Sequence, residues 1–265
     1  MDAKRPLPDP GTAGPVTDRD YWDASWAASA EIKPIPGWHA TWGRRGVFLS
    51  LMRRHVGRSI VDGARVIELG GAMSPRLMAL VQWAGCAGTA LDYSPSGLAA
   101  TRAMFAAHGV GVDCVAADMF TYEAERPFDL VTHWGLIEHF ARPEVVLEAS
   151  ARLVRPGGVV AFGMPNMRAW AAHLWRTKSP QSWSRHIYHS DEVIRDACAM
   201  AGLELTSSFH WHVPLVARPW ESPERWLKAL TMIQTGLYGV AKFLPVFRWG
   251  TAAVSCERAF VAIRR

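Results

Sequence analysis

Three acidic residues stand at the ends of three short apolar segments: Glu68, Asp92 and Asp118. Because the carboxyl ends of neighbouring parallel strands meet at one edge of a sheet, we expect these carboxylates to lie together. Asp92 follows a glycine pair by about twenty residues, the spacing at which a carboxylate accepts hydrogen bonds from the hydroxyls of a ribose. Asp118 is placed to accept from the exocyclic amine of adenine, with Met119 against the ring. The pattern predicts a site for a nucleoside-bearing cofactor; an ordinary strand-end role for each acid is the alternative.

The glycine pair Gly70-Gly71 follows the apolar run of residues 66–69, and Ser74-Pro75 comes soon after it. Glycines let the backbone turn sharply and approach a ligand closely. Serine as N-cap and proline at the first helical position begin a helix, whose N-terminus favours anions. This order of strand, turn and helix is typical of nucleotide sites, although a turn that binds nothing is the alternative.

Histidines supply the candidate proton acceptors, because their pKa lies close to neutral pH. His133 ends a predicted strand, His139 follows shortly after it, and His186 and His189 lie in the segment 165–189. We take His133, His186 and His139 as candidate catalytic residues. For His133 the alternative is a structural role at a strand end, and for His139 it is helix capping and packing.

Strands and helices alternate through the middle of the chain. The predicted strands cover residues 66–69, 88–93, 112–117, 128–133 and 159–163, and the predicted helices cover 75–84, 95–108 and 143–153. A helix over 191–201 and strands over 203–213 and 255–263 follow. Such alternation indicates an α/β fold with a doubly wound, mostly parallel sheet and a ligand at the carboxyl ends of its strands.

The remaining segments do not share this alternation. Residues 1–18 are rich in Pro and Gly and are expected to be flexible. Residues 19–60 form a predicted helical N-terminal cap, and residues 165–189 and 214–250 are predicted insertions or lids in a single domain, 19–265. The cap either packs on the sheet or closes over a ligand, and the sequence leaves both open.

Tryptophan is distributed unevenly. Only Trp83 and Trp134 of the 13 tryptophans fall within residues 51–165. The others lie in the cap and after the fifth strand, where a substrate is expected. An aromatic-lined site suits a planar or apolar small molecule, whereas attachment of the lid to the sheet is the alternative.

Composition excludes several classes of function. The formal charge of +5 is spread along the chain, whereas nucleic-acid binding usually needs a dense basic stripe. The four cysteines are far apart and form no CxxC pair, which indicates reduced thiols in the cytoplasm and no zinc site. The chain begins with charge and proline and shows no secretion signal.

Residues 226–247 are apolar along one helical stripe. Lys242, Pro245 and two glycines make a membrane-spanning helix a poor interpretation. A helix under the lid or in a homodimer contact is preferred, and a helix on a membrane surface is the alternative.

Five segments together resemble the class I S-adenosylmethionine-dependent methyltransferases. They are Val66-Ile-Glu-Leu-Gly-Gly71, Leu91-Asp92, Ala117-Asp118-Met119, Phe128-Asp-Leu-Val131 with Leu136-Ile-Glu-His139, and Leu153-Val-Arg-Pro-Gly-Gly158. The resemblance implies a seven-stranded Rossmann-like sheet with an antiparallel last strand, and S-adenosyl-L-methionine as cofactor. The candidate cofactor-binding residues are Glu68, Gly70, Gly71, Ala72, Asp92, Tyr93, Asp118, Met119 and His133.

The chain departs from that family at three positions. Ala72 and Ser74 stand where the family has glycines, which leaves the path of the methionine tail open. Glu138-His139 resembles part of the metal-binding Glu-x-x-Glu-His of the ubiquinone-pathway O-methyltransferases, but Gly135 replaces the first Glu, so no metal is expected. A nicotinamide dehydrogenase is disfavoured because the turn lacks Gly-x-Gly-x-x-Gly.

The sequence therefore predicts a cytoplasmic methyltransferase of a small aromatic or cyclic metabolite, such as those of secondary metabolism. O-methyl transfer is preferred to N-methyl transfer, with an in-line displacement and a histidine as base. A cofactor-binding scaffold without turnover and a methyltransferase of a membrane lipid are the alternatives.

Overall fold

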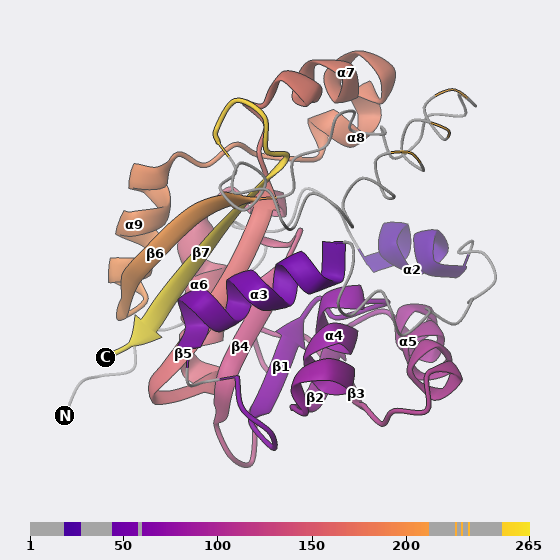
Figure 1. Ribbon diagram of the computed structural model, residues 1–265, viewed down its shortest axis with the longest axis vertical. Coiled ribbons are helices and arrows are strands. Elements are labelled where there is room, and N and C mark those ends of the chain that lie inside the picture. Colours follow the sequence, from indigo (N-terminus) through magenta and orange to yellow (C-terminus); the bar gives the residue numbers. More distant parts are fainter. Residues whose placement is uncertain are drawn as a thin grey trace.

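Seven strands form the centre of the protein in the computed structural model, which describes residues 19–27, 44–57, 60–211, 226, 229, 233 and 251–265. They are β1 Arg65–Leu69, β2 Ala87–Asp92, β3 Asp113–Ala116, β4 Phe128–Trp134, β5 Val154–Pro165, β6 Leu203–Trp211 and β7 Glu257–Arg264. Their order in the sheet is β3-β2-β1-β4-β5-β7-β6 (Figure 1). Only the pairs made by β7 are antiparallel among these strands. The predicted mostly parallel sheet with an antiparallel last strand is confirmed.

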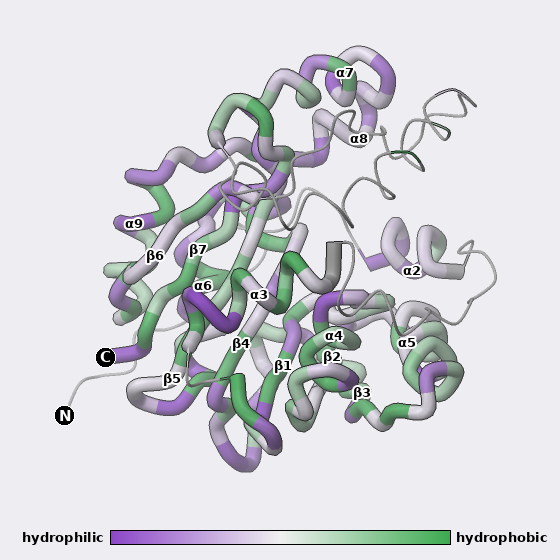
Figure 2. The backbone as a smooth tube through the Cα atoms, viewed as in Figure 1, coloured by the Kyte–Doolittle hydropathy of each residue, from purple (hydrophilic) through white to green (hydrophobic). Residues whose placement is uncertain are grey.

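Helices cover both faces of the sheet because alternate side chains of each strand point to opposite faces. One face packs against α3 Arg44–Val56, α4 Pro75–Ala84 and α5 Pro95–Ala107, and the other against α6 Pro143–Leu153 and α9 Asp191–Met200. Val66 and Leu130 belong to the hydrophobic cluster on the α4 face of the sheet, and Ile67 and Val131 belong to the hydrophobic cluster on the α6 face. Hydrophobic residues accordingly predominate along α4 in Figure 2.

The helices that follow β1 and β2 begin as their sequences predict. Ser74 caps α4 by accepting hydrogen bonds from the N–H groups of Arg76 and Leu77, and Ser94 caps α5 by accepting from Gly97. Proline occupies the first turn of each helix. The strand predicted over 159–163 begins earlier in the structure, because β5 already pairs with β4 at Val154, before Gly157 and Gly158.

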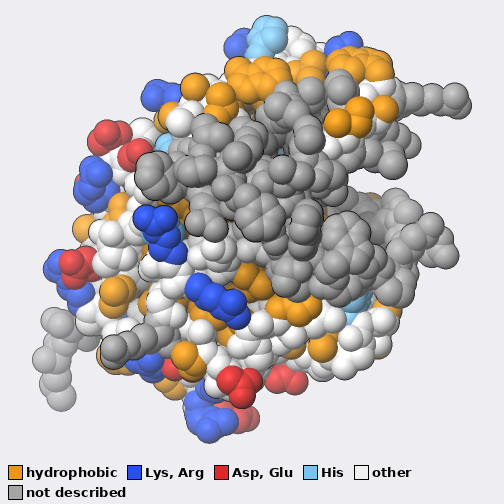
Figure 3. All heavy atoms as spheres, viewed as in Figure 1, with side chains coloured by type: hydrophobic (Ala, Val, Ile, Leu, Met, Phe, Trp, Pro, Cys, Tyr) orange, Lys and Arg blue, Asp and Glu red, His pale blue; other side chains and the backbone are white. Residues whose placement is uncertain are grey.

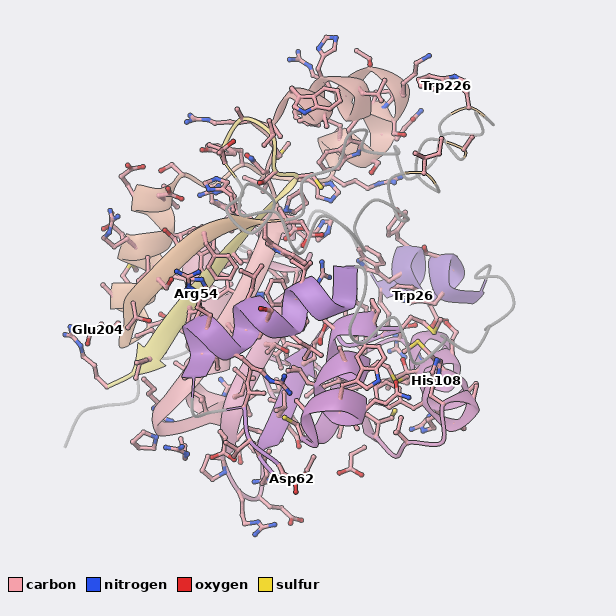
Figure 4. The ribbon with its side chains drawn as sticks, in the orientation of Figure 1. Trp26, Arg54, Asp62, His108, Glu204 and Trp226 are labelled. Atoms are coloured by element: carbon pink, nitrogen blue, oxygen red, sulfur yellow. The ribbon has the colours of Figure 1, made fainter. Side chains whose placement is uncertain are left out.

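Four short elements lie at the carboxyl end of the parallel strands: α2 Arg19–Ala27, η3 Ile137–His139, α7 Trp170–Lys178 and α8 Pro180–Ser184. Figure 1 shows α2 beside α5, and α7 and α8 beyond the end of β5. In Figure 4, Trp26 marks this end of the molecule, and Asp62 lies at the opposite end. The insertion predicted over 165–189 therefore contains α7 and α8.

Two of the predicted outer segments fall mainly outside the described residues. Residues 1–18 lie entirely outside them, and of residues 214–250 the structure describes only Trp226, Ala229 and Ile233. Both predictions stay predictions. In the part of the chain that is described, no helix combines the length and the apolar character needed to cross a membrane.

Candidate active site

The glycine turn after β1 leaves bare backbone at the carboxyl end of the sheet. Gly70 is exposed and adopts a φ of +64°, a conformation that favours glycine. Gly71 has another role, because a Cβ there would lie 2.8 Å from the Glu68 carbonyl oxygen and 3.1 Å from the Ala90 Cα. It lets the turn pack against β2, while Gly70 offers its surface to a ligand.

Asp92 ends β2 next to this turn, as predicted. Its Oδ2 accepts a hydrogen bond from the N–H of Ala72 at 3.2 Å, and its Oδ1 accepts one from the N–H of Ser94 at 2.9 Å. Burial raises the pKa of Asp92, and these N–H groups oppose the shift. Because each carboxylate oxygen has a second lone pair, the side chain is held in place and still able to accept hydroxyl hydrogen bonds.

Asp118 and Met119 follow β3 in the turn that borders Asp92. Asp118 is exposed, and its Oδ1 accepts a hydrogen bond from the N–H of Phe120 at 2.9 Å. Met119 is buried in the hydrophobic cluster that lies on the α6 side of the sheet, and Tyr93 is half-buried. The exposed Gly70 backbone and the fixed carboxylate of Asp92 fit the ribose of an adenosyl group, and Asp118 is open to an adenine amine.

Glu68 lies on the α4 face of the sheet and is buried. Burial raises its pKa to about 7, although the Ser74 hydroxyl, the Arg76 guanidinium and the Thr132 hydroxyl all lower it. The Thr132 hydroxyl lies 3.5 Å from Glu68 Oε2. Glu68 therefore titrates near neutral pH, beside the start of α4.

Helix α2 is attached to α5 through one carboxylate. Asp23 Oδ1 accepts hydrogen bonds from the hydroxyls of Ser94 and Ser96, both at 2.6 Å, and from the N–H of Ser96 at 3.2 Å. These hydrogen bonds lower the pKa of Asp23. From this anchor Trp22 reaches His139, with ring centroids 5.5 Å apart. Helix α2 thus lies over the carboxyl end of the sheet as well as against α5.

The side chains of Trp22, His139, Trp175, Trp183 and His186 form what we call the aromatic–histidine cluster. The rings of His139 and His186 lie 4.7 Å apart. Trp175 packs edge-on against His186 at 4.7 Å and against Trp183 at 5.1 Å. Segments 22, 139 and 175–186 meet here, far apart in the sequence but together in space.

Hydrogen bonds fix the tautomers of both histidines in the cluster. His186 Nδ1 lies 2.7 Å from the Ser182 carbonyl oxygen, and His139 Nδ1 lies 2.9 Å from the Arg185 carbonyl oxygen. A carbonyl oxygen only accepts, so each Nδ1 carries the proton and each Nε2 has a free lone pair. Burial lowers the pKa of His139 to about 4 and also lowers the pKa of His186. Both rings are neutral at pH 7 and able to take a proton.

Glu138 completes this group, and its contribution was not predicted. The side chain is 2% exposed, and neither carboxyl oxygen has a hydrogen-bond partner among the described residues. Burial raises its pKa to about 8. One ligand atom each from Glu138, His139 and His186 lies within 4.8 Å of the others, a separation at which they can hold a cation. At Glu138-His139 the expectation of no metal relied on Gly135, and His186 brings a third candidate ligand that spacing could not reveal.

His133 is separate from this cluster. The side chain has no exposed surface, its ring stacks on Phe162 at 5.0 Å, and neither nitrogen has a partner among the groups described. Burial lowers its pKa to about 3. The His133 side chain therefore lies in the core between the sheet and α6. A side chain without solvent access does not suit the predicted roles of base and cofactor contact. His189 is also buried, and its Nε2 lies 3.1 Å from the Phe140 carbonyl oxygen.

The surface near the cluster is partly apolar. Trp170 is 50% exposed on α7, and Trp226 and Ile233 are 51% and 59% exposed. Figure 3 shows hydrophobic side chains gathered at the end of the molecule that carries α7 and α8. Helices α2, α7 and α8, which we call the cover, therefore contribute apolar side chains to the cluster, and α7 also presents one outward.

Comparison with known proteins gives a consistent result. A family profile described as "Methyltransferase domain" matches residues 43–208. The ubiquinone biosynthesis O-methyltransferase of Chromobacterium violaceum is 30% identical over 148 residues, which are 55% of this chain and 60% of that protein. The corresponding protein of Azotobacter vinelandii is 32% identical over 143 residues, 53% of this chain and 57% of that protein. The chain thus matches no more than 60% of the length of either relative.

Solved structures share the fold at lower identity. The magnesium protoporphyrin IX methyltransferase of Synechocystis PCC 6803, with bound S-adenosylhomocysteine, has a TM-score of 0.56 and 14% identity, covering 93% of this chain and 97% of that one. An N-methyltransferase of Bradyrhizobium japonicum has a TM-score of 0.53 and 14% identity, covering 94% and 99%. These similarities show a common architecture.

Proposed function

The chain belongs to the methyltransferase-domain family, and from this membership we propose that the protein transfers a methyl group from S-adenosylmethionine to a hydroxyl of a small aromatic or cyclic molecule. The aromatic–histidine cluster carries the proposal, because it places two neutral histidines beside aromatic rings at the carboxyl end of β4. The relatives named O-methyltransferases, at 30% and 32% identity, support the choice of oxygen as acceptor.

The residues around the glycine turn suit the cofactor. Asp92 would accept hydrogen bonds from the ribose, Gly70 would let the adenosyl group approach the backbone, and the exposed Asp118 would accept from the adenine amine. When bound, S-adenosylmethionine supplies a methyl group on a sulfonium, which needs an aligned nucleophile and little covalent help. The protein then has to orient the acceptor, exclude water and remove one proton.

Orientation of the acceptor is assigned to the tryptophans of the cover. Trp22 comes from α2, and Trp175 and Trp183 come from α7 and α8, so the rings approach from two sides of the cluster. Aromatic faces bind planar apolar groups well. A buried aromatic side chain removes about 150–250 Å² from water, an area comparable to the surface of a small ring compound. The rings also keep water from the histidines.

Removal of the hydroxyl proton is assigned to His186. Its Nδ1–H is held by the Ser182 carbonyl, so Nε2 is the free acceptor. Burial keeps the ring neutral at pH 7. Burial lowers the pKa of His139 to about 4, so that ring is a weak base, and we assign it to orient the acceptor.

A second role for the cluster is cation binding, favoured by the three ligand atoms of Glu138, His139 and His186. Backbone carbonyls hold the Nδ1–H of both histidines, which is also the usual arrangement of histidine ligands. Metal analysis of the purified protein, followed by dialysis against a chelator, separates the roles. Activity that survives complete metal removal supports the base, and activity restored only by a divalent ion supports the cation.

The proposed function is tested with S-adenosylmethionine labelled in the methyl group and a panel of phenols, alicyclic alcohols and amines. We expect binding of S-adenosylhomocysteine by calorimetry and label transfer to a phenolic hydroxyl. Tight binding with no acceptor in the panel would instead favour a scaffold without turnover. Absence of S-adenosylhomocysteine binding would overturn the proposal.

A further inference from the structure

Residues 185–190 connect α8 to α9 and carry the proposed base, His186; we call this segment the strap. The strap belongs to no helix or strand, so its position depends on individual contacts rather than on the hydrogen bonds of a regular element. One such contact fixes it to η3, because the N–H of Ile187 donates to the Glu138 carbonyl at 2.8 Å. The contacts at the other end of the strap therefore matter for where His186 lies.

A buried arginine holds that other end. Arg258 is 3% exposed, and its Nη1 donates to the His189 carbonyl at 2.6 Å. Its Nη2 pairs with the carboxylate of Asp191, the first residue of α9. The guanidinium also lies over the ring of Tyr188, 5.4 Å from the ring centroid. All three contacts are made at the junction of the strap and α9.

The sheet fixes the position of Arg258. The residue lies near the start of β7, where it is paired with Met164 of β5 and with His210 of β6. Its guanidinium packs over the Phe260 ring at 5.1 Å, on the α6 face of the sheet. A planar guanidinium offers several donors in one rigid geometry, so it can hold two acceptors at once. Arg258 thus attaches an irregular segment to the most regular part of the fold.

The burial of this arginine needs an explanation. A buried charge is costly unless it is paired and hydrogen-bonded, and apolar residues of similar volume often replace a buried ion pair without loss of stability. The Asp191 side chain is 47% exposed, so it does not need a buried cation to neutralise it. The geometry that Arg258 imposes on the strap explains its presence better than neutralisation of Asp191 does.

We propose that Arg258 is a positioning residue for methyl transfer, and that it holds the strap so that the His186 ring stays beside His139 and Trp175. This inference rests on the proposed function, because Arg258 acts through His186. His186 lies three residues before His189, whose carbonyl Arg258 holds. Loss of these contacts would free one end of the strap and displace the ring from the acceptor.

The test is a double-mutant cycle of Arg258→Met and His186→Gln, measured as kcat and KM for methyl transfer. Alone, Arg258→Met should lower kcat about 10- to 100-fold, because displacement of a catalytic group by about 1 Å costs on the order of 100-fold. KM for S-adenosylmethionine should change by less than about twofold. In the His186→Gln background, Arg258→Met should change kcat by less than about twofold, since the group that it positions is already absent.

Two further variants separate positioning from stability. Arg258→Lys keeps the charge without the planar fork and should recover part of the lost kcat, and it replaces Arg258→Met in the cycle if that variant does not fold. Arg264→Met is the matched control, because Arg264 also lies on β7 and donates to a backbone carbonyl, that of Val154, but at the opposite edge of the sheet. Its kcat should stay within about twofold of the wild type.

Additive losses in the cycle, or an equal loss of kcat in Arg264→Met, would overturn the inference. Hydrogen exchange of residues 185–190 is a second readout that needs no acceptor. Exchange should be faster in Arg258→Met than in the wild type and in Arg264→Met, and unchanged exchange would also overturn the inference. Absence of methyl transfer by the wild type to any acceptor would count against the proposed function, while faster exchange in Arg258→Met would still support the attachment of the strap by Arg258.

Discussion

The two halves of the carboxyl edge are built in opposite ways. In the half formed by β1 and β2, polar groups are paired within the protein: Asp92 accepts two backbone N–H groups, and the N–H groups of Gly71 and Met73 donate to Leu91 and Thr101. In the half formed by η3 and the cover, buried polar atoms lack partners, as the Glu138 oxygens do in the described structure. The first half is complete without a ligand, and the second is not.

This difference reflects what each half has to recognise. A paired network holds its groups in one geometry and suits a ligand that never changes, such as a cofactor. Unpaired buried groups cost about 1–3 kcal/mol each, and a ligand that pairs them recovers that cost. We therefore expect affinity for the cofactor to depend on the first half, and turnover and acceptor selection to depend on the second.

Replacement of His186 is expected to have the largest effect. His186→Gln removes the free Nε2 that takes the hydroxyl proton, and loss of a general base typically lowers kcat by about 100- to 10,000-fold. Binding of S-adenosylhomocysteine should be unchanged. His173→Gln, at an exposed histidine of α7, is the control and should behave as wild type. A similar loss in both variants, or none in either, would remove His186 from the mechanism.

Replacement of Asp92 should produce the converse pattern. Asp92→Ala removes the ribose acceptor and frees the N–H groups of Ala72 and Ser94, so we expect S-adenosylhomocysteine to bind about 100-fold more weakly. At saturating cofactor, kcat should fall much less. Calorimetry and initial rates at several cofactor concentrations measure both quantities. Unchanged affinity would contradict the assignment of this half to the cofactor.

The same contrast explains what the sequence could predict. The first half is local: Gly70, Ser74 and Asp92 lie within one strand–turn–helix–strand unit, whose start signals and spacing are visible in the sequence, and the structure confirms the elements. The second half joins α2, η3 and α8, and no spacing rule connects Trp22, Glu138 and His186. Sequence patterns identified tryptophans and histidines as candidates but could not show which of them meet.

His133 shows what a position at the end of a strand cannot predict. Its position at the end of β4 predicts a catalytic role, yet the alternation of strand side chains turns it toward Phe162, on the α6 face, whereas its neighbour Trp134 lies on the α4 face. Deciding between the two faces requires knowing which helices cover each of them. That information comes from packing, which a strand-end pattern does not contain.

The pH dependence of turnover tests the assignment of His186 as the base. A base has to be neutral, and burial lowers the pKa of His186 below 6.5, so kcat/KM should be flat at neutral pH. It should fall about tenfold per pH unit once the pH drops below that lowered pKa. Rates from pH 4.5 to 8.5, with affinity for S-adenosylhomocysteine measured in parallel, check this. A rate that falls instead as the pH rises would contradict a neutral histidine base.

The smallest expected effect concerns His133, whose burial predicts a contribution to acid sensitivity and none to catalysis. The folded protein protonates this ring only near pH 3, whereas the unfolded chain does so near 6.5, so the unfolded state binds the extra proton between these values. Stability therefore falls as the pH drops through this window, by about 1.4 kcal/mol per pH unit from this residue.

His133→Leu, which is similar in volume and does not titrate, should remove that slope. The free energy of unfolding, measured in urea at pH 6 and pH 5, should fall less in the variant than in the wild type by about 1 kcal/mol, and the subtraction cancels the opposite contributions of Glu68 and Glu138. Turnover at pH 7.5 should stay within about twofold, because a ring without exposed surface cannot reach an acceptor hydroxyl. A loss of turnover comparable to that of His186→Gln would instead make His133 the base. The division of the carboxyl edge into a paired cofactor half and an unpaired acceptor half would then fail.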